Sequence, residues 1–200
     1  MKRVLTICAA ASLMGAVTAW AGQPPAAGGG GRGQVRKVDV ATGLQAAYQT
    51  FKRNFTQAAD KMPEADYTFK PGSTPEARTF AQVIDHITQA QFGQCSGLAG
   101  QPNPMQGKQL EQELKTKAEV TKALADSFAV CDSLFNDVTD ANAMESVRMG
   151  MNEAPRVAAL YGIIVHGNEM YGTAAVYLRS KNIVPPSTEN AGRGRGRGRN

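Results

Sequence analysis

Four long stretches of this chain repeat apolar residues at steps of three and four positions, and loops rich in proline and glycine separate them. Apolar residues with this spacing lie on one face of an α-helix. Elsewhere, no run alternates apolar and polar residues convincingly enough to predict a β-strand. Amphipathic helices bury their apolar faces against one another, so the chain is predicted to be all-α, a bundle of helices. The expected helices span about 40–62, 79–98, 116–137 and 152–181.

Several residues mark where these helices begin and end. The segment Thr116–Glu119 has the pattern of a capping box, in which two side chains bond the free N–H groups of the first turn. Pro155 is expected in the first turn of the last helix, where its missing N–H costs little. Asn182 suits the left-handed position after that helix, and Pro185 and Pro186 block its continuation.

The first 21 residues have the parts of a secretory signal peptide. Lys2 and Arg3 are positive, residues 4–17 are apolar, and the small residues Ala19 and Ala21 precede the expected cleavage site. A transmembrane anchor is the alternative, but this apolar run is shorter than the roughly 20 residues that a span needs. We therefore expect an exported protein, periplasmic or secreted, with no membrane span after signal cleavage.

The rest of the chain divides by composition into a linker, one domain and a tail. Residues 22–37 are rich in glycine and proline, and residues 189–200 carry an Arg-Gly repeat, so both are expected to be disordered. Residues 38–188 suffice for a single helical domain. The formal charge is +5, but nine of the 22 basic residues and only one of the 17 acidic residues lie outside this domain. The domain is thus near −3, and no nucleic acid is expected as a partner.

Two cysteines, Cys95 and Cys131, remain after signal cleavage, one in the second expected helix and one in the third. An even number of cysteines in an exported protein favours a disulfide. Loop-closure entropy gives such a bridge about 3–4 kcal/mol of stabilisation. The alternative is a pair of reduced thiols, buried as small apolar side chains.

The chain has two histidines, His86 in the middle of the second expected helix and His166 in the middle of the last. A lone histidine on a helix is more often a packing or surface residue than a metal ligand. At about 100° per residue, however, small and polar residues share the helix face of each histidine, which predicts a pocket between the two helices. The expected lining is Gln82, Thr173 and Tyr177, and the small residues Ala90, Gly93, Gly97 and Gly162 lie on the same faces.

Two parts of the chain resemble motifs of the DinB-like superfamily. The segment from Arg78–Phe80 through Asp85–Ile87 is similar to the motif of that family's second helix, and His166–Gly172, continuing to Ser187, resembles its last-helix signature. The resemblance covers most of residues 38–188. It implies an antiparallel up-down-down-up four-helix bundle. It also implies a site at which many members hold a divalent metal with three histidines, one from the second helix and two from a His-x-x-x-His pair in the last.

This sequence departs from the family pattern at the third ligand. His86 and His166 match the first two histidines, but Met170 stands at the third position. A thioether is a poor ligand for zinc, nickel or manganese and a better one for Cu(I). Glu169 offers an oxygen donor as a substitute, and the remaining alternative is that no metal binds. At most one divalent metal ion is therefore expected as a cofactor, and the sequence does not identify it.

The residues support two functional hypotheses. The first is a binding or non-catalytic protein with a degenerate two-histidine metal site and a small-molecule ligand. The second is a metal-dependent hydrolase or thiol-dependent transferase acting on a small molecule, as relatives in the family imply. No catalytic residue is identified, because Asp85, Glu153 and Glu169 are expected to be ordinary surface charges. A homodimer is compatible with the resemblance but has no signal of its own in the sequence.

Overall fold

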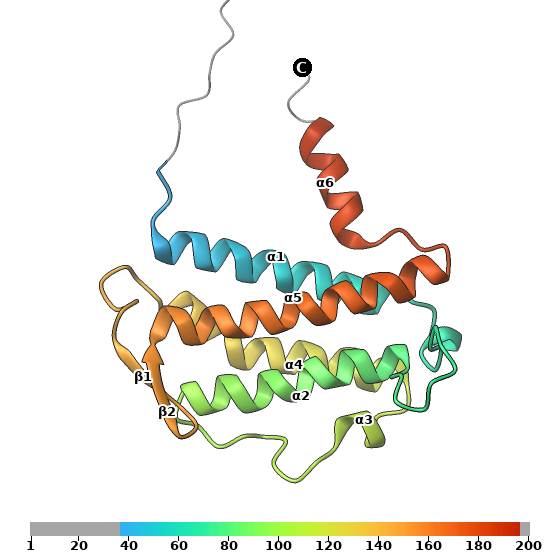
Figure 1. Ribbon diagram of the computed structural model, residues 1–200, viewed down its shortest axis with the longest axis horizontal. Helices are drawn as coiled ribbons and strands as arrows, with labels where there is room; N and C mark the ends of the chain where they lie inside the picture. Colours follow the sequence, from blue (N-terminus) through green and yellow to red (C-terminus); the bar gives the residue numbers. More distant parts are fainter. Residues whose placement is uncertain (1–36, 197–200) are drawn as a thin grey trace, which may run out of the picture. The chain divides into compact units, whose positions relative to one another are not determined.

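The computed structural model describes the backbone of residues 37–196 and the side chains of residues 37–191 (Figure 1). The expected signal peptide, nearly all of the expected linker and the last residues of the tail lie outside this part of the chain. The helices are α1 (Val40–Lys61), α2 (Phe80–Leu98), α3 (Leu110–Glu113), α4 (Lys117–Asn136), α5 (Arg156–Ser180) and α6 (Pro186–Gly196), with a short 3₁₀ turn η1 (Glu64–Asp66) and strands β1 (Ser146–Met149) and β2 (Asn152–Pro155).

The four long helices pack around one apolar core. Helices α1 and α2 each lie against both α4 and α5. Figure 1 shows α1 and α5 running in one direction and α2 and α4 in the other. Buried aromatic rings fill the centre: Tyr48 stacks on Phe135 with centroids 3.8 Å apart, and Phe51 packs against Phe128 at 5.3 Å. Within residues 37–196, no helix is both long and apolar enough to cross a membrane.

Side chains satisfy the free backbone groups at the helix ends. The expected capping box at the start of α4 is present, with Thr116 and Glu119 bonding each other's backbone N–H. Each such cap contributes about 1 kcal/mol. At the other end of α5, Asn182 adopts the expected left-handed conformation, with φ of 59°. The N–H groups of Asn182 and Ile183 bond the carbonyls of Arg179 and Leu178, which is the Schellman pattern.

The fold is not purely α-helical, because β1 and β2 form an antiparallel hairpin where the sequence pattern predicted no strand and a helix from about residue 152. Ser146 pairs with Pro155, and Gly150 makes the turn with φ of +62°. Pro155 is also the residue before α5 rather than part of its first turn. A proline disfavours the helical conformation of the residue before it. Ala154 is therefore extended, and the helix begins only after Pro155.

The start of the tail also differs from the expectation of disorder from residue 189. Helix α5 ends before Pro185 and Pro186, as expected, but Pro186 then opens the further helix α6. Proline suits the first position of a helix because its N–H is not needed there. Glu189 forms an ion pair with Lys61 of α1, which ties the new helix to the domain.

Helices α1 and α5 approach each other closely at Gly167. A Cβ atom added to Gly167 would lie between 2.3 and 2.8 Å from three ring carbons of Phe51. Real Cβ atoms do not come this close to other atoms, and the Phe51 ring is fully buried among other core side chains. Gly167 is therefore required by packing.

Cys95 of α2 and Cys131 of α4 lie at disulfide distance, with their Cα atoms 5.2 Å apart. Both residues are fully buried. The bridge expected from the cysteine count therefore joins the pair of helices with the most extensive mutual contact. It closes a loop of 36 positions, which contains α3 and the segment leading into it.

Asp85 of α2 is buried in the core, with no exposed surface, whereas the sequence pattern placed it on the surface. Neither of its carboxylate oxygens has a hydrogen-bond partner among the described residues. Burial raises the pKa of Asp85 from 3.8 to about 8, with a further contribution from the negative charge of Glu111. Burial therefore favours the neutral, protonated form of Asp85.

Gly167→Ala should destabilise the protein by up to about 2 kcal/mol net, because the added methyl group overpacks the core against Phe51 at a cost toward the upper end of the roughly 1–3 kcal/mol of such changes. This cost exceeds the gain in helix propensity from replacing glycine, which is about 1 kcal/mol. Gly172→Ala is the matched control, since an added Cβ in the same helix meets nothing within 4 Å and should stabilise the protein slightly. Denaturant unfolding measures both, and equal shifts in the two variants would contradict the packing role.

Replacing both Cys95 and Cys131 by alanine should lower the free energy of unfolding by about 4 kcal/mol, the loop-closure value for a bridge of this span. Guanidinium unfolding with and without dithiothreitol measures the effect. The reductant should lower the midpoint of the wild type and leave that of the double variant unchanged. Titratable Cys95 and Cys131 thiols in the denatured, unreduced wild type without residues 1–21 would show that the bridge does not form.

Asp85→Asn should change the pH dependence of stability. In the wild type the folded-state pKa lies above that of the unfolded chain, so stability falls as the pH rises from about 4 to 8. The amide does not titrate, so the variant should gain on the wild type by about 2 kcal/mol or more across this interval. Denaturant unfolding at pH 5 and pH 9 measures the difference. Asp126→Asn, at an exposed position, is the control, and parallel curves for Asp85→Asn would contradict the prediction.

Candidate functional site

The two histidines lie side by side between neighbouring helices. His86 projects from α2 and His166 from α5, and their ring centroids are 5.4 Å apart with the ring planes at 89°. Both side chains are partly exposed, so the pair lies at the edge of the core and is open to solvent. The juxtaposition expected from the sequence is therefore present.

A carboxylate and a guanidinium both contact Nδ1 of the His86 ring. Glu111 of α3 places Oε1 2.9 Å from Nδ1 of His86, and Arg78 places a terminal nitrogen 3.2 Å from the same atom. Arg78 also donates from Nε to Glu111 at 2.9 Å. Nδ1 carries either a proton or a lone pair. It donates to Glu111 in one tautomer and accepts from Arg78 in the other. The Glu111 contact leaves the lone pair on Nε2, which is how carboxylates orient metal-binding histidines.

The sequence analysis did not find Glu111 as part of the site, because Glu111 lies in a single helical turn within a loop. No periodicity marks such a turn, and its position depends on tertiary packing. Gln82 helps to hold it there, since its amide donates to the carbonyl of Glu111. Arg78 appeared only within a motif, although its place just before the cap of α2 lets a long side chain reach back along the helix.

The charge state of His166 suits a lone-pair donor. Burial lowers the pKa of His166 from its ordinary value of 6.5, and the nearby His86 lowers it further. Glu169 acts in the opposite direction, and Arg78 adds a smaller lowering effect. His166 is therefore neutral at pH 7, the form in which imidazole binds metals.

The residues present do not form the three-histidine centre that the family resemblance implies. Met170, at the third position, is only 9% exposed and belongs to the apolar core. Glu169 is exposed on the outside of α5. Among the described residues, no group of three or more His, Cys, Asp or Glu side chains is arranged to hold a metal ion. Two imidazoles remain as metal donors, with Glu111 beside one of them.

The pocket residues expected from the sequence have structural roles near the histidines. Gln82 completes the capping box of α2 with Thr79. The hydroxyl of Thr173 donates to the carbonyl of Glu169 within α5, and the hydroxyl of Tyr177 donates to the carbonyl of Arg78 at 2.6 Å. Gln82 and Tyr177 therefore fix the chain around the start of α2, whereas Thr173 bonds only within α5.

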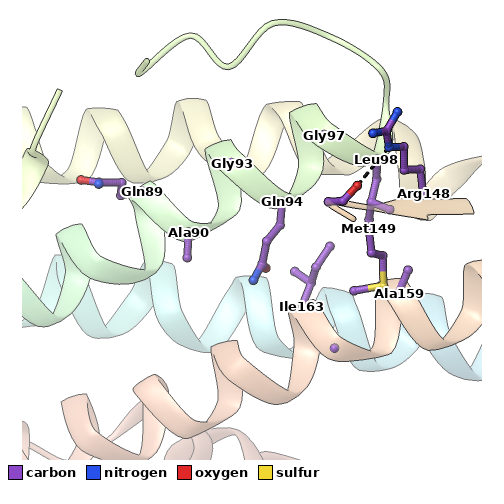
Figure 2. A pocket seen from close by; sticks show the side chains of 12 residues that line it. Gln89, Ala90, Gly93, Gln94, Gly97, Leu98, Arg148, Met149, Ala159 and Ile163 are labelled. Carbon is purple, nitrogen blue, oxygen red and sulfur yellow. Dashed lines mark hydrogen bonds between the residues drawn. The ribbon is translucent and has the colours of Figure 1, made fainter. Parts of the chain in front are cut away.

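A cavity of about 450 Å³ lies in the groove between the two histidine-bearing helices, α2 and α5, at the end next to the hairpin (Figure 2). Gln82, Thr173 and Tyr177 do not line it. Gln89 and Ala90 follow His86 by three and four residues, and Gly162 and Ile163 precede His166 by four and three, so these lining residues lie one helical turn from the histidines. The small residues on the two histidine faces thus leave space, as expected, but at the end of the groove near β1.

Comparison with known proteins gives a consistent result. The sequence profile of the DinB superfamily matches residues 47–169, a range that contains both histidines. The chain is similar in structure to a DinB-like protein from Bacillus cereus, with a TM-score of 0.59 and 16% identity over 72% of this chain and 94% of that one. A DinB-like protein from Bacillus subtilis gives a TM-score of 0.52 and 16% identity over 70% and 92% of the two chains.

A conserved protein from Enterococcus faecalis is also similar, with a TM-score of 0.54 and 15% identity over 72% of this chain and 97% of that one. At identities this low, structural similarity shows a shared fold and says nothing about a shared activity. No functionally curated protein matches the chain. The profile covers more than half of the sequence, so the chain belongs to the DinB superfamily.

Proposed function

We propose that this chain is an exported binding protein that holds a divalent transition-metal ion weakly at His86 and His166 and does not catalyse a reaction. The signal-like first 21 residues and the Cys95–Cys131 bridge support export, since disulfides persist in oxidising compartments. In this proposal the domain is an up-down-down-up bundle of α1, α2, α4 and α5, to which the hairpin and the short helices are additions.

The observation that carries the proposal is the burial of Met170 in the apolar core, at the position of the family's third histidine. Zinc enzymes use three protein ligands and keep one position for water or substrate. Two imidazoles leave an ion held mainly by water, which exchanges readily. Such a site favours reversible binding over catalysis.

The groups around the pair also favour weak binding. Glu111 orients His86, and the low pKa of His166 leaves its lone pair free of a proton at neutral pH. Arg78 acts against binding, because its positive charge lies within 3.2 Å of the His86 ring and repels a cation. The sum of these effects is a site that takes an ion only when its concentration is high.

Glu111 also supports one alternative, a metal-dependent hydrolase or thiol-dependent transferase. If the carboxylate left Arg78, two imidazoles and one carboxylate would face the same space, a ligand set found in metal enzymes. A bound ion would then supply a Lewis acid with open positions. Glu111→Gln separates the two proposals, since loss of a ligand should abolish binding, whereas loss of an orienting group should only weaken it.

Isothermal titration of the metal-free, untagged protein with Zn²⁺ or Ni²⁺ should show one weak site at pH 7.5. His86→Ala and His166→Ala should each remove it. Met170→His should strengthen it at least about tenfold, since even an outer-shell partner changes metal affinity by that factor. Binding should weaken from pH 7 to pH 5, because protons compete for the imidazoles.

The control for this titration is Asp126→Asn, which removes an exposed carboxylate of α4 and should leave the affinity unchanged. Circular dichroism checks that each variant is folded. A wild-type protein that retains one equivalent of metal through dialysis against a chelator would contradict the weak site and favour the enzyme. Absence of binding at millimolar metal, together with no gain in Met170→His, would remove metal from the function altogether.

A further inference from the structure

The cavity between α2, α5 and the hairpin has walls from three separate parts of the chain. Helix α2 contributes Ala90, Gly93 and Gly97, and α5 contributes Ala159, Gly162 and Ile163. The hairpin closes one end with Arg148 and Met149, and Figure 2 shows Met149 pointing toward Ala159. A volume of about 450 Å³ lies within the range of small-molecule sites, roughly 300–1,000 Å³.

The glycines of this cavity have no packing function that the structure explains. An added Cβ at Gly97 or Gly162 would meet no atom within 4 Å, and at Gly93 it would make only an ordinary contact with Asn103 at 3.8 Å. Glycine inside a helix is destabilising relative to alanine. Gly167 of α5 differs, because Phe51 occupies the space that its Cβ would need. The cavity glycines instead keep open a volume that side chains would otherwise fill.

The lining is mainly apolar, with two neutral amides, Gln89 and Gln94, and one positive end. Ala90, Leu98, Met149, Ala159 and Ile163 are apolar, and methionine adapts its shape to different ligands. Arg148 is the one charged residue in the lining, which contains no Asp or Glu. Its Nε donates to the carbonyl of Gly150, and this bond uses one of the five N–H donors of the guanidinium.

We propose that this cavity binds an amphiphilic organic anion, with an apolar chain or ring between α2 and α5 and a carboxylate at Arg148. The proposal goes beyond the metal site and does not depend on it. Glycines on both helices admit the apolar body close to the helix backbones. The guanidinium at the mouth pairs with the carboxylate, and no Asp or Glu lines the cavity itself. Glu153 lies directly across the hairpin from Arg148, where its carboxylate accepts a hydrogen bond from the Ser146 hydroxyl.

Octanoate is the probe, titrated into the purified protein in a buffer with EDTA, so that metal at the histidines contributes nothing. One equivalent should bind. Gly162→Leu should weaken binding at least tenfold by filling the slot. Gly172→Leu is the matched control, because it makes the same change in the same helix at an equally open position that does not line the cavity, and its affinity should equal that of the wild type.

Arg148→Gln should weaken octanoate binding about tenfold, the value of a hydrogen bond to a charged group, and leave the binding of uncharged 1-octanol within twofold. Gly97→Leu fills the slot from the opposite wall and replaces Gly162→Leu if circular dichroism shows that variant to be unfolded. Wild-type protein without affinity for octanoate would overturn the proposal, as would equal losses in Gly162→Leu and Gly172→Leu. The proposal would also be overturned if the wild type formed a dimer, bound no octanoate, and became monomeric in Gly162→Leu. In that case the cavity would be a contact between two copies of the chain.

Discussion

The close contact of Gly167 with Phe51 fixes where α5 lies, and the position of the histidine site follows from it. The missing side chain lets α5 rest on a buried aromatic ring of α1. One residue earlier, about 100° around the helix, His166 then emerges at the edge of the core beside α2. His86 meets it there, with 5.4 Å between ring centroids. The geometry of the site is thus a consequence of helix packing.

This dependence on packing explains how residue 170 can be a methionine while the fold persists. Met170 contributes its side chain to the core, where a thioether packs well, and so adds to the burial that holds the helices together. The Cys95–Cys131 bridge ties α2 to α4 without involving either histidine. A protein stabilised in this way can change the chemistry of its groove without unfolding. The groove is then free to serve a ligand other than a metal ion.

The sequence predicted those features that depend on periodicity and on local hydrogen bonding. These include the long helices, the capping box at Thr116, the left-handed Asn182 and the meeting of the two histidines. It did not predict Glu111 beside His86 or the burial of Asp85. Both depend on how a loop packs over α2, and an acidic residue on a helix is usually exposed. The position of the pocket was missed because the strands of the hairpin that closes it have four residues each, too few for a convincing alternation of polar and apolar residues.

The hairpin itself has a local cause, and that cause extends to the cavity. Pro155 keeps Ala154 extended, so the chain cannot enter α5 earlier and pairs with β1 instead. This pairing places Arg148 and Met149 over the end of the groove between α2 and α5. Had the helix begun near residue 152, as the apolar pattern suggested, no strand would cover that end and the glycine-lined slot would open directly to solvent. Pro155 is therefore one reason why the groove between α2 and α5 is closed at one end by the hairpin, with Arg148 as the positive group there.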